Sequence, residues 1–213
     1  QYLKEFFMDI LTTNYGISPK LVKRAEDLEA SLKEEFNKIE KIQEKNQLWV
    51  LDCFREERIQ PSHFAATYGY GYDDTGRDKL KTLFARIFKA EDAIVRPQIA
   101  SGTHALALAL QGLTKKGTRI LSASGAPYDT LEGIIGHKEE TEGSLCDMGA
   151  TYKELPLKNK RLDLEGLKKE AENADLIMLQ RSRGYQDRPS VLVSEIKQAC
   201  DIIRNVNKNA IIF

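Results

Sequence analysis

Hydrophobic and polar residues alternate with a helical period along the first part of the chain. Apolar side chains recur every three or four positions over residues 21–42, with charged residues between them, which predicts one long amphipathic helix. Ser18 suits the N-cap of this helix and Pro19 its first position. A second helix is predicted over residues 47–59, because Pro61 cannot continue it.

The same apolar stripe is also compatible with a coiled coil. The repeat lasts only about three heptads before Asn46 and Gln47, which is the lower limit for a sustained coiled-coil pattern. We therefore favour packing of this helix against the rest of the chain or against a sister subunit. A helical interaction module built on residues 18–46 is the competing hypothesis.

Beyond residue 77, short apolar runs alternate with helical segments. The predicted helices cover residues 77–88, 102–115, 129–136, 163–173 and 193–207, and the predicted strands cover residues 93–99, 118–123, 151–155, 176–180 and 210–213. Strands separated by helices of this length need crossover connections, which produce a parallel sheet. The predicted fold class is α/β, a mainly parallel sheet sandwiched by helices. An N-terminal helical segment, residues 1–60, precedes the sheet domain, residues 61–213.

Composition and charge argue against several classes of partner. The 213 residues carry 32 basic and 32 acidic side chains, a formal net charge of zero, so we expect no nucleic acid and no membrane surface as partner. No apolar run approaches the roughly 20 residues of a membrane span and no signal sequence is recognisable, so we expect a cytoplasmic protein. The three cysteines are widely spaced and are expected to be free thiols.

Three small residues, Ser101, Gly102 and Thr103, join the predicted strand at residues 93–99 to the helix that follows. The first N–H groups of a helix lack partners and its dipole is positive there, so this junction is suited to bind a phosphate. Gly102 would let the anion approach the backbone, and the two hydroxyl groups would add donors. Plain N-capping by Ser101 is the alternative, and the spacing alone does not decide between them.

Four segments of the chain, in this order, resemble one enzyme family. They occupy residues 68–80, 100–110, 126–136 and 180–190 and read YGYGYDDTGRDKL, ASGTHALALAL, APYDTLEGIIG and QRSRGYQDRPS. Together they are similar to the aluminium-resistance or methionine γ-lyase-like family, and the likeness runs from Pro19 to Phe213. It implies a pyridoxal 5′-phosphate (PLP) protein of the fold-type-I transferase class, in which residues 61–213 form an incomplete large domain.

The resemblance assigns roles to residues of two segments. Ser101, Gly102 and Thr103 match the loop that holds the cofactor phosphate. Tyr128 takes the place of the aromatic residue that stacks on the pyridine ring, and a flat aromatic face is suited to that contact.

Two further contacts are less closely matched. In the cystathionine relatives a tyrosine and an arginine reach the phosphate of the neighbouring subunit. Tyr68 or Tyr70 would be that tyrosine, but no arginine has the matching offset, and Arg77 is the nearest. Ser182 or Arg183 would replace an asparagine near the phenolic oxygen of the cofactor. A solvated or ion-paired arginine is the alternative reading of that segment.

The resemblance also implies groups that the sequence does not contain. The family's aspartate at the pyridinium nitrogen and its Schiff-base lysine would lie after Phe213, where the chain stops within a strand just begun. The implied function is a PLP-dependent carbon–sulphur lyase acting on a sulphur-containing amino acid, in a homodimer or homotetramer with a shared active site. We expect the 213-residue chain alone to be inactive. A non-catalytic or regulatory protein on the same fold is the alternative.

Overall fold

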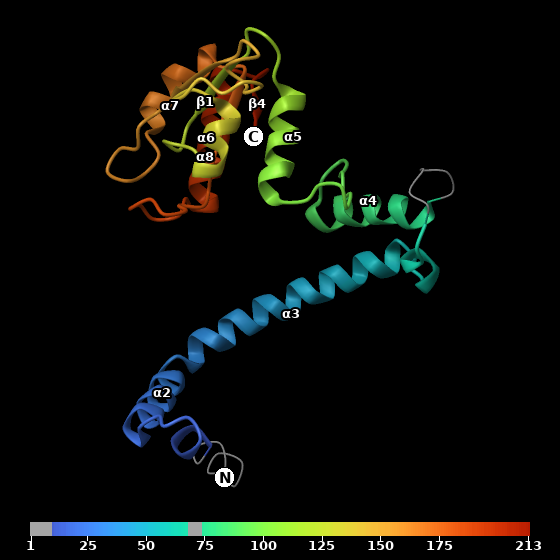
Figure 1. Ribbon diagram of the computed structural model, residues 1–213, viewed down its shortest axis with the longest axis vertical. Coiled ribbons are helices and arrows are strands. Elements are labelled where there is room, and N and C mark those ends of the chain that lie inside the picture. Colours follow the sequence, from blue (N-terminus) through green and yellow to red (C-terminus); the bar gives the residue numbers. More distant parts are fainter. Residues whose placement is uncertain (1–9, 68–73) are drawn as a thin grey trace. The chain divides into compact units, whose positions relative to one another are not determined.

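The computed structural model describes residues 10–67 and 74–213. It divides the chain into two compact units, Gln1–Arg96 and Pro97–Phe213, and Figure 1 traces both. The division that the sequence predicts at residue 60 stays a prediction. In the first unit the helix that follows residue 74 packs against the helices that precede it.

The first unit is helical. Its described elements are α2 (Pro19–Ser31), α3 (Lys33–Glu56), the 3-10 helix η1 (Pro61–Phe64) and α4 (Thr75–Phe88). The predicted N-cap is confirmed, since the Ser18 hydroxyl accepts a hydrogen bond from the Leu21 amide at 3.3 Å. The prediction of one helix over residues 21–42 is wrong, because the backbone leaves helical geometry at Leu32, where ψ is 0°.

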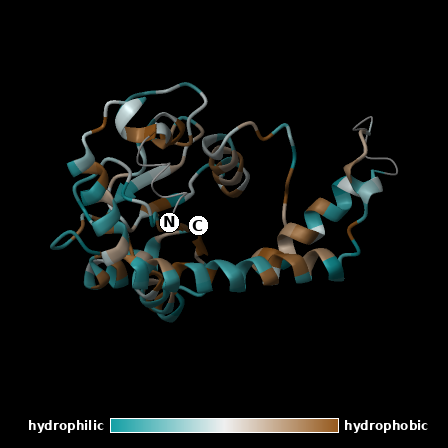
Figure 2. Cartoon of the chain, turned by 90° about the horizontal axis from the view of Figure 1, so that it is seen from below, coloured by the Kyte–Doolittle hydropathy of each residue, from teal (hydrophilic) through white to brown (hydrophobic). Residues whose placement is uncertain are grey.

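Polar contacts hold α4 against the end of α3. The Trp49 indole donates to the Ile87 carbonyl at 3.0 Å. The buried Glu57 carboxylate accepts from Arg86 at 2.7 Å and from Thr82 at 2.9 Å, and these bonds lower the pKa of Glu57. The amino-terminal half of α3 is different, because Ile39 and Ile42 are about 60% exposed. Figure 2 shows hydrophilic and hydrophobic residues alternating along this long helix.

The second unit contains a parallel sheet with helices on both faces, as the sequence predicted. The strands are β1 (Arg119–Ser122), β2 (Thr151–Glu154), β3 (Leu176–Met178) and β4 (Ile211–Ile212), in the order β2-β1-β3-β4. The helical elements are α5 (Gly102–Leu113), α6 (Asp129–Ile135), α7 (Leu164–Glu170), η2 (Ala171–Asn173) and α8 (Val193–Val206). The finer assignment to fold type I stays a prediction.

Successive strand residues supply two separate cores. Leu121 and Ile177 point to one face, where they pack with residues of α7 and α8. Ile120 and Leu176 point to the other face, where they pack with residues of α5 and α6. The central strand β3 is buried on both faces and appears in the sequence as a continuous apolar run, whereas β2 at the edge of the sheet is only partly buried and carries polar residues.

One predicted strand is absent. Residues 93–99 form no strand and no helix. Pro97 lacks the N–H that a ladder needs, and Ile94 is 78% exposed, so it packs against no neighbouring strand. An apolar run of this length therefore serves as the connection between the two units. Within the described ranges, no helix is both long and apolar enough to cross a bilayer.

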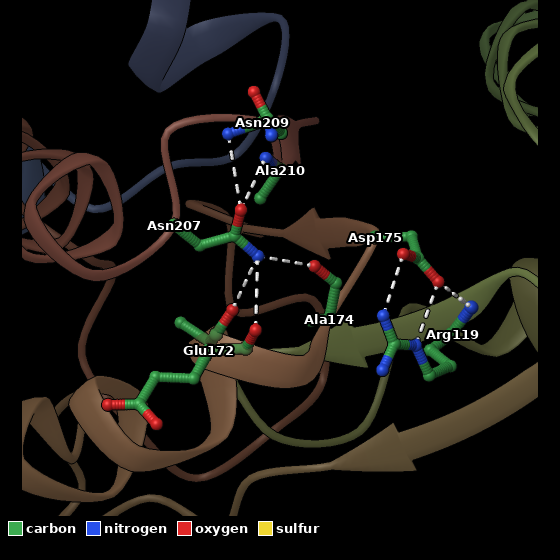
Figure 3. A network of polar contacts seen from close by, with 8 residues as sticks. Arg119, Glu172, Ala174, Asp175, Asn207, Asn209 and Ala210 are labelled. Carbon is green, nitrogen blue, oxygen red and sulfur yellow. Dashed lines mark hydrogen bonds and ion pairs between the residues drawn. The ribbon is translucent and has the colours of Figure 1, made fainter.

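Side-chain hydrogen bonds close the amino end of the sheet (Figure 3). The Asn207 amide donates to the carbonyls of Ala171 and Ala174, both at 2.9 Å, and its oxygen accepts from the amides of Asn209 and Ala210. This one side chain therefore links η2, the start of β3 and the turn into β4.

Replacement of Asn207 by alanine is expected to lower the free energy of unfolding by about 2 kcal/mol, because several buried backbone groups lose their partner. Urea unfolding would measure the loss. Asn205→Ala is the control, since Asn205 is an exposed residue of the last turn of α8. Equal stability of the two variants would contradict the assignment.

An ion pair joins the starts of β1 and β3 beside this network. Asp175 accepts from the Arg119 amide, Nε and Nη2 at 2.9, 3.0 and 2.9 Å. These hydrogen bonds lower the pKa of Asp175 from 3.8 to about 2. Both side chains are about half exposed, so solvent screening keeps the contribution of the pair to stability small.

Because the pKa of Asp175 is lowered by folding, its contribution is fully present above about pH 4 and is lost as the pH falls toward 2. Asp175→Asn is therefore expected to be less stable than the parent at pH 5 to 7, with the difference disappearing near pH 2. Unfolding curves across this range test it. A difference that persists unchanged at pH 2 would exclude the ion pair as its cause.

Candidate functional site

Three chain segments meet at the carboxyl ends of β1 and β3. They are the turn after β1 that leads into α6, the loop after β3, and the first turn of α5. The main-chain amide of Gln180 donates to the buried Ser124 hydroxyl at 2.8 Å, which joins the loop after β3 to the turn after β1. The hydroxyls of Thr103 and Thr130 lie 3.1 Å apart and join α5 to α6. The site is therefore assembled entirely within the second unit.

Ser101 caps α5. Its hydroxyl accepts a hydrogen bond from the His104 amide at 3.0 Å, and the His104 ring in turn accepts from the Ala100 amide at 3.2 Å. The N-capping interpretation of Ser101 is thus confirmed. A hydroxyl that accepts in this way still has its own proton to donate, so capping leaves this residue able to contact an anion.

The next two amides are available to a ligand. Among the described residues, the backbone N–H groups of Gly102 and Thr103 have no hydrogen-bond partner. A Cβ placed on Gly102 would meet no atom within 4 Å, so the space in front of this residue is open. The first turn of α5 contains no acidic residue. These groups fit a phosphate, which prefers unpaired amides at a helix N-terminus.

Tyr128 is fixed by the loop after β3. It is the N-cap residue of α6, and its amide donates to Oε1 of Gln180 at 2.8 Å. Its ring lies against Gly184, where an added Cβ would be only 2.8 Å from the ring carbon Cε2. Gly184 has a φ of +56°, a conformation that suits glycine. The structure thus brings together Tyr128 and the 182–184 segment, which the sequence treated separately.

The two residues predicted after β3 differ in what they offer. The carbonyl of Ser182 accepts from Gln180 Nε2 at 3.0 Å and from Arg188 Nη2 at 2.7 Å, while the residue itself is exposed. Arg183 is exposed and lines a cavity of about 290 Å³ beside Tyr128. The other residues lining this cavity are Ala126, Pro127, Asp129, Glu132, Gln180, Tyr185 and Gln186. Tyr68 and Tyr70 lie outside the described residues.

The sequence did not single out several residues that organise the site. Gln180 is a polar residue two positions after the buried strand β3, and that position could have signalled its role. Thr130, Gln186 and Arg188 gave no such signal, because their partners are remote or are main-chain groups. No group of three or more potential metal ligands occurs in the described part of the chain.

Comparison with known proteins identifies the family. Residues 21–213 match the family model described as methionine gamma-lyase, and the chain belongs to that family. The resemblance seen in the sequence is thereby confirmed at family level.

Several proteins resemble this chain over most of its length. A Clostridium acetobutylicum protein, whose proposed identity is a cystathionine beta-lyase involved in aluminum resistance, is 40% identical, with a TM-score of 0.93 over 98% of this chain and 51% of its own. A carbon-sulfur lyase involved in aluminum resistance from Clostridium novyi NT is 39% identical, with a TM-score of 0.88 over 95% of this chain and 49% of its own. The uncharacterized protein YnbB of Bacillus subtilis is 40% identical over 91% of this chain and 47% of its own. The chain thus spans about half the length of these relatives.

The contact between Tyr128 and Gly184 generates a prediction. Gly184→Ala is expected to displace the Tyr128 ring and to destabilise the protein by about 2 kcal/mol, because the methyl group would overlap the ring and alanine disfavours positive φ. Thermal unfolding and the NMR signals of the Tyr128 ring would report the two effects.

Gly143→Ala separates the two causes. Gly143 also has a positive φ, of +75°, but a Cβ there would meet no atom within 4 Å. This control therefore carries the backbone penalty without the overlap. If both variants lose the same stability and the Tyr128 signals stay in place, the ring contact is unimportant.

Proposed function

We propose that this chain forms the cofactor-phosphate-binding part of a PLP-dependent carbon–sulphur lyase that acts on a sulphur-containing amino acid. The observation that carries the proposal is the open first turn of α5, with two unpaired amides and a neighbouring threonine hydroxyl. Family membership and the names of the relatives support the same reaction class.

Each proposed contact has a physical basis in the described residues. The amides of Gly102 and Thr103, with the hydroxyls of Ser101 and Thr103, would hold the phosphate at the positive end of the α5 dipole. Thr130 lies close enough to Thr103 to add a further donor. Tyr128 would offer the pyridine ring a face that Gly184 does not contact, since Gly184 lies against the ring carbons Cδ2 and Cε2.

The remaining groups serve orientation and access. Ser182 and Arg183 would lie beside the ring edge, and the exposed guanidinium of Arg183 would favour negative charge there. When bound, PLP supplies an electron sink for charge that develops at the substrate α-carbon. Within the proposal, this chain binds and orients, whereas the proton-transfer lysine and the aspartate belong to sequence after Phe213.

The same proposal covers the assembly and the setting. A homodimer or homotetramer would let Tyr68 or Tyr70 of one subunit reach the phosphate held by another. The small-molecule partner would be a cystathionine-like or methionine-like amino acid, and the protein would act in the cytoplasm.

An activity assay on the complete protein would test the reaction. Such substrates should release thiol and 2-oxo acid, and this activity should be lost when the cofactor is removed and recovered when it is returned.

Gly102→Ala tests directly whether the first turn of α5 binds the phosphate. The added methyl group meets nothing in the ligand-free protein, so folding should be unaffected. It would occupy the space in front of the two amides, so the affinity for PLP should fall about tenfold or more, as expected for loss of charged hydrogen bonds. Equilibrium titration of the complete protein measures this.

Gly112→Ala is the matched control. Gly112 also lies in α5, and a Cβ there also meets no atom within 4 Å, so both variants change helix propensity in the same direction. Only Gly102→Ala should weaken cofactor binding. Unaltered PLP affinity in Gly102→Ala would rule out phosphate binding at the first turn of α5. A parent protein that binds PLP without releasing thiol would support the regulatory alternative.

A further inference from the structure

Arg188 is a buried arginine without an acidic partner. Its side chain lies in the loop after β3 and the residue is only 3% exposed. Among the described residues, no carboxylate lies within ion-pair distance of its guanidinium. The three groups that it contacts are neutral: the Gln186 side-chain oxygen at 2.7 Å, the Ser182 carbonyl at 2.7 Å and the Pro189 carbonyl at 3.2 Å.

Burying this guanidinium costs free energy, which its hydrogen bonds must offset. Burial of a charge without a counter-charge is unfavourable, and here it lowers the pKa of Arg188. The cost is offset only by the hydrogen bonds that the guanidinium makes. Those bonds hold together two positions six residues apart, Ser182 and Arg188, in a loop whose ends are already joined by the bond from the Val191 amide to the Arg181 carbonyl.

The loop held by Arg188 is attached to the turn that carries Tyr128. Because Arg188 Nε donates to Oε1 of Gln186, the amide of Gln186 is oriented with Nε2 toward the Ala126 carbonyl, 3.0 Å away. The Ser182 carbonyl accepts hydrogen bonds from Arg188 Nη2 and from Gln180 Nε2. Oε1 of Gln180 in turn accepts one from the Tyr128 main-chain amide. Two glutamine side chains thus connect the loop to residues 126–128.

We propose that Arg188 is a positioning residue for the ring of Tyr128. It acts through Ser182 and Gln186, which fix the position of the loop in which Gly184 contacts the ring. The guanidinium itself touches no ligand. The inference rests on the proposed function only for the identity of the ligand, the pyridine ring of PLP, that stacks on Tyr128.

The geometry also explains why arginine stands at this position. A planar guanidinium can serve three acceptors in fixed directions, whereas a lysine ammonium is a single compact donor group on a flexible stem. Arg188→Lys keeps the charge and most of the side-chain length. It should therefore loosen the loop while leaving the proposed phosphate-binding amides of α5 unchanged.

The test compares two probes on the complete protein. Pyridoxine 5′-phosphate has the ring and the phosphate but no aldehyde, and inorganic phosphate has no ring. Arg188→Lys is expected to weaken binding of pyridoxine 5′-phosphate by about three- to tenfold, the effect of a lost aromatic contact, with the affinity for inorganic phosphate unchanged. Arg181→Lys, an exposed arginine in the same loop, should change neither.

A ligand-free readout separates this inference from the proposed function. The NMR signals of the Tyr128 ring, assigned with Tyr128→Phe, should shift in Arg188→Lys and not in Arg181→Lys. If the parent binds neither probe, the proposed function fails while the Tyr128 signals still decide the role of Arg188. Unmoved signals, or equal weakening of both probes, would overturn it. Should Arg188→Lys fail to fold, Gln186→Leu must give the same selective pattern.

Discussion

The parallel pairing of β1 with β3 is the constraint on which the site depends. In this register Ser122 lies beside Met178, so the segments that leave the two strands start next to each other. Ser124 and Gln180, 56 residues apart in sequence, can then form a hydrogen bond. Everything that holds Tyr128 follows from this contact, because Gln180 is placed by β3 and the turn into α6 is placed by β1.

Two helix N-termini face this edge, and their sequences differentiate them. The first turn of α6 already carries Asp129 and Glu132, whereas that of α5 carries no acidic residue. The positive end of α6 is therefore partly neutralised by its own side chains, whereas the unpaired amides of Gly102 and Thr103 lie in a favourable potential. The bond between Thr103 and Thr130 brings the two ends together, so an anion on α5 would lie near the ring of Tyr128.

The sequence predicted those parts of the molecule that depend on local pattern. The parallel strands, the helices around them and the Ser18 cap follow from periodicity and capping rules. The departure at Leu32 was missed because side-chain spacing does not record a single non-helical residue. The apolar run at residues 93–99 was misassigned because hydrophobicity does not tell whether a neighbouring strand exists. Tyr128 and Gly184 became partners only through the sheet, which no spacing along the chain could have indicated.

The site also shows how rigidity can be obtained from polar contacts at the edge of a core. Ala123 and Val191 extend one core past the carboxyl ends of the strands, and polar contacts fix the segments that lie beyond them. There, Gln180 and Gln186 each make contacts to two segments, and Arg188 removes the freedom of the loop that carries them. Such bonds are directional, whereas hydrophobic contacts are not. A ring that is held in one orientation is better fixed by directional bonds, even when a buried charge makes them costly.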